Sequence, residues 1–147
     1  MVKMGKKVIA CLLSVCILSA VGSPAFAAPA AKAVKSNGSG IHVMYTNTDN
    51  IDANLNFSGE RAECSGCVEG KSGTSKITAK GVLKQKTSSG TRTVKTWTES
   101  ASGNALYFDK SYYVAGGYKY IFTITAKVYR NGTVETVSAS DSDYCYG

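Results

Sequence analysis

Three cysteines are the residues of this chain whose types and spacing could do chemistry. Cys64 and Cys67 form a C-x-x-C pair within the stretch RAECSGCVEG, and Cys145 lies far along the chain from them. A C-x-x-C pair can exchange disulfides or supply half of a zinc site. The first question is therefore whether this pair is redox-active, metal-binding or structural.

The sequence around the pair disfavours redox and metal chemistry. In redox proteins the first cysteine of such a pair usually begins a helix, whereas the residues that follow Cys67, VEGKSGT, are typical of a turn. A zinc site would need Cys64, Cys67 and Cys145 together with His42, the only histidine, and their spacing matches no standard zinc module. We therefore predict no metal and no cofactor.

Catalysis by other groups is also disfavoured. A Ser-His-Asp arrangement would have to use His42, because the chain has no other histidine. The ten acidic residues are scattered, and no two of them lie together in an apolar stretch as a glycosidase would require. No glycine-rich phosphate loop follows a strand and opens a helix. The sequence therefore predicts a protein that is not an enzyme.

Strand alternation separates the two cysteines of the pair. If residues 61–70 form a strand, Cys64 shares the buried face with Ala62 and Val68, and Cys67 points outward. Residues three apart in a strand lie about 10 Å apart, beyond the ~7 Å Cα separation that a disulfide allows. A direct Cys64–Cys67 bond would therefore need a turn or bulge at the intervening glycine.

The first 27 residues predict export. Three lysines precede an apolar run that is too short to span a bilayer, and Ala25-Phe26-Ala27 fits a signal peptidase site. We predict a signal peptide over 1–27, a flexible lead-in over 28–40 and one domain over 41–147. The remaining chain carries fourteen basic and ten acidic residues, too small an excess to indicate nucleic-acid binding. No membrane span is expected once the signal is removed.

The rest of the chain alternates with a period of two, which predicts strands. Strands are expected to begin near Ile51, Arg61, Lys76, Arg92, Ala105, Tyr118 and Thr133, with a further short one over 41–46. Asn131-Gly132 predicts a tight type I′ hairpin turn between the last two. About seven antiparallel strands predict a single all-β sandwich, immunoglobulin- or fibronectin type III-like, with a small closed barrel as the alternative.

The sandwich suggests a structural use for the cysteines. The end of the last strand should lie near the start of the second, which brings Cys145 toward the C-x-x-C pair. An exported protein with three cysteines favours one disulfide and one remaining thiol. We prefer Cys64–Cys145, with Cys67–Cys145 as the alternative, and the bond would contribute about 2–5 kcal/mol.

A family resemblance agrees with this interpretation. The run IDANLNFSG…RAECSG…GKSGTSKITAKGVLKQK…VKTWTES…YYVAGGYKYIFTITAKVY resembles small secreted proteins of Gram-positive bacteria that carry a single immunoglobulin- or fibronectin-like β-sandwich. Tyr118, Tyr120 and the strand that contains them are also similar to the penultimate strand of fibronectin type III domains. The resemblance implies secretion and fold, and it implies no catalytic residue.

Two groups of side chains are candidate surface contacts. Lys80, Lys84 and Lys86 share the outward face of one strand, with Lys76 in line, and this stripe could meet teichoic acid or anionic lipid. Lysines on an outer strand face also keep sheets soluble, which is the structural interpretation. Exposed tyrosines, with Tyr112 as the candidate, suit contact with glycan or protein.

The predicted function is a secreted, non-catalytic binding or structural module that acts at or outside the cell surface. Its partners would be protein, glycan or anionic cell-wall polymer. The alternative is a secreted antagonist, such as an antimicrobial protein or its immunity partner, and an enzyme or metal protein is the least favoured. Fold alone does not decide among these functions.

Overall fold

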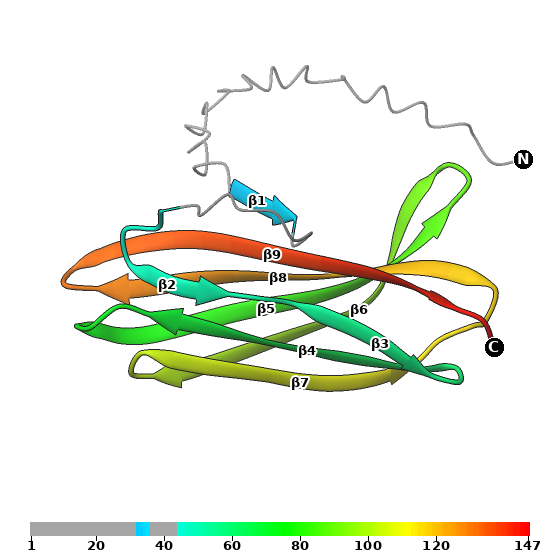
Figure 1. Cartoon of the computed structure of the whole chain (residues 1–147), viewed down its shortest axis with the longest axis horizontal. Coiled ribbons are helices and arrows are strands. Elements are labelled where there is room, and N and C mark those ends of the chain that lie inside the picture. The colour runs from blue at the N-terminus through cyan, green and yellow to red at the C-terminus, as the bar shows by residue number, and fades with distance from the viewer. Residues whose placement is uncertain (1–31, 36–43) are drawn as a thin grey trace, which may run out of the picture.

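The computed structural model describes residues 32–35 and 44–147, and every element in these ranges is a β-strand. The predicted signal peptide and His42 lie outside the described residues. Two sheets pack face to face, so the predicted all-β, antiparallel sandwich is confirmed (Figure 1). Within the described ranges, no helix has the length and apolar character needed to cross a membrane.

The larger sheet has five strands in the order β1-β9-β8-β5-β6. Its members are β1 (Lys32–Lys35), β5 (Thr74–Thr87), β6 (Gly90–Ser102), β8 (Tyr118–Arg130) and β9 (Thr133–Cys145). All neighbours run antiparallel except β1, which lies parallel to β9 and belongs to the segment predicted as a lead-in. The tip of the β5–β6 hairpin, light green in Figure 1, projects away from the sandwich.

The smaller sheet is centred on β4 (Arg61–Gly70), which has the predicted bounds. β7 (Ala105–Tyr113) pairs with one side of β4, and β2 (Thr48–Ile51) and β3 (Asn54–Ser58) pair with the other. The single strand predicted from Ile51 onward is therefore wrong, because the chain breaks between β2 and β3. No strand forms over residues 44–46, the described part of the further short strand predicted at 41–46.

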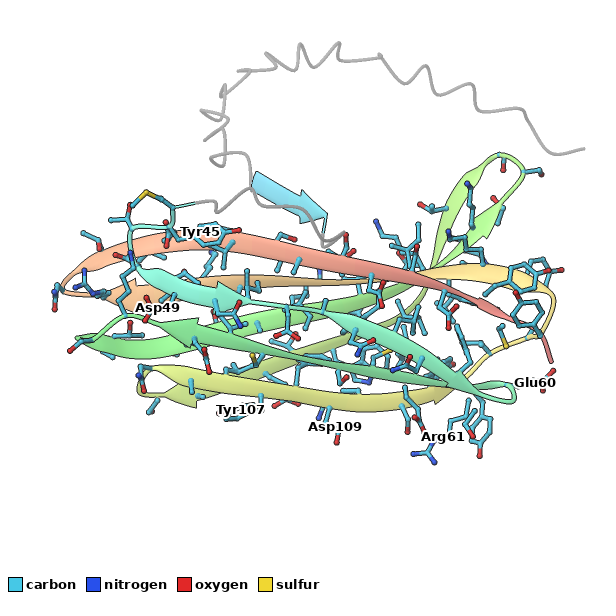
Figure 2. All side chains as sticks on the ribbon, in the orientation of Figure 1. Tyr45, Asp49, Glu60, Arg61, Tyr107 and Asp109 are labelled. Carbon is cyan, nitrogen blue, oxygen red and sulfur yellow. The ribbon has the colours of Figure 1, made fainter. Side chains whose placement is uncertain are left out.

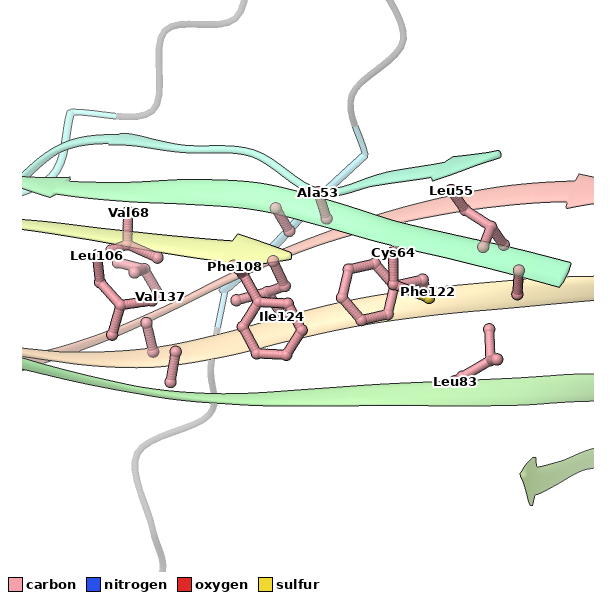
Figure 3. Packing of buried hydrophobic residues seen from close by; sticks show 14 of the residues in the cluster. Ala53, Leu55, Cys64, Val68, Leu83, Leu106, Phe108, Phe122, Ile124 and Val137 are labelled. Atoms are coloured by element: carbon pink, nitrogen blue, oxygen red, sulfur yellow. The ribbon is translucent and has the colours of Figure 1, made fainter. Parts of the chain in front are cut away.

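The hydrophobic core lies between the two sheets and follows the alternation of the strands. Its largest fully buried side chains are Tyr120, Phe108, Phe122, Leu55, Ile77, Leu83, Ile124, Val68, Val128 and Val137. Figure 3 shows Phe108, Phe122 and Leu83 between the ribbons. Trp97 of β6 meets Phe108 and Phe122 edge to face, with ring centroids 6.3 and 6.4 Å apart. Period-two alternation thus separates core from surface as predicted.

The hairpin between β8 and β9 has the predicted turn. Asn131 has a φ of 48° and Gly132 a φ of 77°, and positive φ at both central positions defines a type I′ turn. This turn matches the twist of the flanking strands and sets their register, in which Arg130 faces Thr133. Asn and Gly are the residues that adopt these angles at least cost.

Carboxylates of β9 join the two sheets along one side of the sandwich. Glu135 accepts hydrogen bonds from the backbone N–H groups of Thr46, Asn47 and Thr48 at 2.8, 2.8 and 2.9 Å. Asp141 accepts one from the backbone N–H of Leu55 at 2.9 Å. The segment that holds β2 and β3 therefore binds β9 through side chains rather than through a strand ladder.

Candidate functional site

The two cysteines of the C-x-x-C pair point to opposite faces of β4, as predicted. Cys64 is completely buried and lies opposite Leu55 of β3 and Lys110 of β7. Burial raises the pKa of its thiol to about 12. A buried, protonated thiol is neither a nucleophile nor a metal ligand at neutral pH, so Cys64 acts as a core residue.

Cys67 lies on the outer face and binds Asp52. Its backbone N–H and its Sγ both donate to Asp52 Oδ1, at 3.0 and 2.9 Å. Its pKa is raised to about 12, first by burial and then by the hydrogen bond and charge of Asp52 and the charge of Glu69. Cys67 thus helps to hold the break between β2 and β3 against β4.

Cys145 is buried at the end of β9, where its Sγ lies 3.5 Å from the carbonyl oxygen of Gly59. Cys64, Cys67 and Cys145 are all free thiols in this structure. Gly59 lies in the turn just before Arg61, where β4 begins, so Cys145 lies near the start of β4, as predicted. Cys64 lies further along the same strand. The Cys64–Cys145 disulfide is not formed here and stays a prediction. Among the residues that the structure describes, no three His, Cys, Asp or Glu side chains are arranged to hold a metal ion.

Replacing Asp52 is expected to increase the reactivity of Cys67, although burial, the largest cause of its raised pKa, remains. Asp52→Asn removes the negative charge that raises the thiol pKa, and each unit by which that pKa falls increases the thiolate fraction about tenfold. The alkylation rate of Cys67 at pH 8, measured by mass spectrometry of the native protein, should rise about tenfold or more.

Glu63→Gln, four residues along the same strand face, is the matched control and should leave the alkylation rate of Cys67 unchanged. An equal rate in Asp52→Asn and the unaltered protein would contradict the assigned contact.

Counting the thiols of unreduced, denatured protein that lacks residues 1–27 tests the predicted disulfide separately. Three thiols correspond to this structure, and one corresponds to the predicted bond.

The outward face of the larger sheet gathers basic side chains, and we call it the lysine face. Strand parity places six lysines on it: Lys76, Lys80, Lys84, Lys86, Lys119 and Lys127. The remaining outward positions of β6 and β9 are nearly all threonine or serine. No carboxylate shares this face among the described residues.

All ten acidic side chains of the chain fall within the described residues and lie elsewhere. On β9, Glu135, Asp141 and Asp143 alternate away from the lysine face. Glu99 of β6 also points away and forms a 2.5 Å ion pair with Lys110 of β7. The lysines of this face therefore have no neighbouring carboxylate to neutralise them, and their positive potentials add.

The structure places the predicted contact lysines on one face and places Tyr112 away from them. Lys80 lies opposite Thr125 and Lys84 opposite Ile121, so β8 extends the predicted lysine stripe sideways. Lys119 and Lys127 were not predicted as contacts, although their alternation within β8 was a usable signal. Tyr112 lies elsewhere, with its ring 6.4 Å from that of Trp97 and beneath the Lys95 ammonium.

Aromatic side chains gather at the end of the sandwich where β9 ends. A groove of about 230 Å³ is lined by Phe57, Gly59, Asp143, Tyr144, Tyr146 and Gly147. The rings of Tyr144 and Tyr146 are 4.7 Å apart, and the Tyr144 hydroxyl donates to the carbonyl of Gly117. This groove is small, and Asp143 is the one charged side chain among its lining residues.

Fold and surface thus define a class: an all-β sandwich with one broad cationic face. No family model matches the chain, and no curated protein matches it. Among solved structures, the solution structure of R. palustris CsgH aligns with a TM-score of 0.40 and 10% sequence identity, over 61% of this chain and 87% of that chain. A likeness at this level carries no argument about function. The predicted family of Gram-positive secreted proteins stays a prediction.

Proposed function

We propose that the protein is a non-catalytic binding module that acts outside the cell and holds anionic polymers on its lysine face. The observation that supports this proposal is the segregation of charge, with six lysines and no carboxylate on one sheet surface. Ordinary solvated sheets intersperse both signs, which reduces any single-sign field. An acid-free face attracts polyanions and concentrates them.

The arrangement of the lysines suits a linear polymer. Four of them follow β5, where residues two apart are separated by about 7 Å and residues four apart by about 13 Å. A polymer with repeating phosphates or carboxylates that lies along β5 would meet Lys76, Lys80 and Lys84 in turn, and Lys86 follows where β5 leaves its pairing with β8. Threonine hydroxyls of β6 flank this row and can donate hydrogen bonds to the same oxygens.

Removing two central lysines is expected to weaken polymer binding. Each lysine near an anionic surface contributes about 1 kcal/mol, so the double substitution Lys80→Gln/Lys84→Gln should lower the affinity for polyphosphate roughly 30-fold at low salt. The measurement is a titration of dye-labelled polyphosphate followed by fluorescence anisotropy at several salt concentrations. The affinity should fall less steeply with salt for the variant, because fewer counterions are released.

Arg61→Gln provides a control that removes a positive charge from the opposite face of the sandwich. Its affinity for polyphosphate should match that of the unaltered protein. Arg61→Gln removes one charge where the lysine variant removes two, so weakening by about half as much free energy would show that net charge alone drives binding. No weakening in the lysine variant would place binding elsewhere. Lipoteichoic acid in place of polyphosphate then tests a cell-wall polymer directly.

A further inference from the structure

The outward face of the smaller sheet has the opposite charge to the lysine face, and we call it the acidic face. Strand parity places Glu63, Glu69 and Asp109 on it, against one basic residue, Arg61. Asp52 adds a fourth carboxylate, because it binds the thiol of the outward-facing Cys67. Figure 2 shows Asp109 and Arg61 projecting from the ribbon on one side of the molecule. The sandwich therefore carries excess charge of opposite sign on its two broad surfaces.

The acidic face also presents aromatic rings. Tyr107 and Tyr113 of β7 are each 75% exposed, and they lie six residues apart, about 20 Å along the strand. Exposed tyrosines are enriched at protein interfaces because they bury large area at low entropic cost. The lysine face offers partly exposed apolar side chains in return, since Val82 of β5 and Ile121 of β8 lie diagonally across the strand pair.

The two faces are similar in extent. Three strand rows of about ten residues give the acidic face an area of roughly 500 Å², from the strand spacing and rise. Stacking it on a lysine face would bury roughly 1,000 Å² in total, at the lower end of specific protein interfaces. An interface of this size that depends on charge is weak and sensitive to salt.

From this complementarity we propose that the protein associates with a second copy of itself, the acidic face of one molecule docking on the lysine face of the next. The contact uses two different surfaces and is therefore heterologous. Such a contact leaves a free lysine face at one end and a free acidic face at the other, so association continues into an open stack. Polyanions would compete for the same lysine face and shorten the stacks.

The first test is the mass of the purified protein in solution. Sedimentation velocity at about 0.1 mM protein should show species larger than a monomer at about 20 mM salt, and the monomer at about 0.5 M salt, where screening is strong. Species of increasing size are expected as the protein concentration rises. A monomer at every concentration and salt would overturn the proposal.

Charge reversal on each face tests which surfaces meet. Lys80→Glu/Lys127→Glu alters only the lysine face, and Glu63→Lys/Asp109→Lys alters only the acidic face. Each variant alone should be monomeric, since one of its two complementary surfaces is lost. Mixed in equal amounts, they should form a dimer and nothing larger, because one intact acidic face meets one intact lysine face.

This mixing result distinguishes the proposed contact from a symmetric dimer. A symmetric contact through one face would leave one variant associating on its own, and that result would overturn the proposal. All four substitutions lie at outward strand positions, and circular dichroism checks that each variant is folded. The acidic-face variant keeps every lysine of the proposed polymer site, so its binding of polyphosphate is tested independently of self-association.

Discussion

Gly66→Ala is expected to lower the free energy of unfolding by about 3 kcal/mol, a large effect for one methyl group. A Cβ at Gly66 would lie 2.3 Å from the backbone carbonyl oxygen of Asp52 and 2.6 Å from Cδ1 of Ile124. The Asp52 carbonyl cannot simply rotate away, because the neighbouring N–H of Asp52 donates to the Cys67 carbonyl. The whole break between β2 and β3 would have to move off β4.

Gly81→Ala is the matched comparison for Gly66→Ala. Its Cβ would meet the ring of Phe108, with Cζ at 2.4 Å, and a ring can tilt where a backbone cannot. We expect a smaller loss, about 1–2 kcal/mol, and partial recovery in the double variant Gly81→Ala/Phe108→Leu. Urea denaturation of both variants measures the difference. Equal losses at the two glycines would contradict the assignment of the Gly66 contact to backbone.

The role of Gly66 could not be read from the sequence around it. Between two cysteines, a glycine is an obvious place for a turn, and the sequence offered no sign of the chain that crosses over it. That chain comes from residues 52–53, and Ile124 comes from the other sheet. In a sequence, a close approach between distant segments is visible only as a small residue, and small residues also occur for other reasons.

Local alternation, in contrast, predicted most of what depends on the direction of a single side chain. The opposite orientations of Cys64 and Cys67 follow from one strand, and so does the row of lysines on β5. The same alternation places the candidate contact Tyr112, which is 37% exposed and whose role as a contact stays a prediction. It shares strand parity with the buried Leu106 and Phe108, so its ring lies beside Trp97 and not on the outer face of the smaller sheet.

Predicting the segregation of charge requires both the alternation within each strand and the order of strands in the sheets. Alternation assigns each lysine to one side of its own strand, but only the pairing of β5 with β8 brings Lys127 beside the row on β5. The position of the acidic residues depends on topology as well. Glu63 and Asp109 share a face because β4 and β7 are neighbours, although they are far apart in the chain.

Replacing Glu135 is expected to be nearly as damaging as the change at Gly66. Its carboxylate accepts three backbone N–H groups and the Thr48 hydroxyl, and hydrogen bonds to a charged group are stronger than neutral ones. Glu135→Ala leaves these donors without their acceptor, and we expect a loss of about 2–4 kcal/mol. Glu135→Gln should lose less, because one acceptor oxygen remains.

The same carboxylate makes stability depend on pH. Burial alone would raise its pKa, but the hydrogen bonds from Thr46, Asn47 and Thr48 outweigh burial and hold the pKa below its usual value of 4.5. A carboxyl whose pKa is lower in the folded state stabilises the protein above its unfolded pKa. That stabilisation is lost as pH falls through the folded pKa, so stability should decrease in the range below about pH 4.5.

Urea denaturation of the unaltered protein and of Glu135→Ala, at pH 7 and at steps below pH 4.5, measures this contribution. The stability gap between the two should be largest at pH 7 and should narrow as the carboxylate is protonated. Glu63→Gln is the control, since its outward carboxylate makes no such hydrogen bonds, and its difference from the unaltered protein should be small at pH 7. A gap for Glu135→Ala that stayed constant with pH would mean that lost packing, rather than the charged acceptor, causes the damage. The hydrogen-bonded carboxylate, which joins β9 to the segment before β2, would then have no stabilising role of its own.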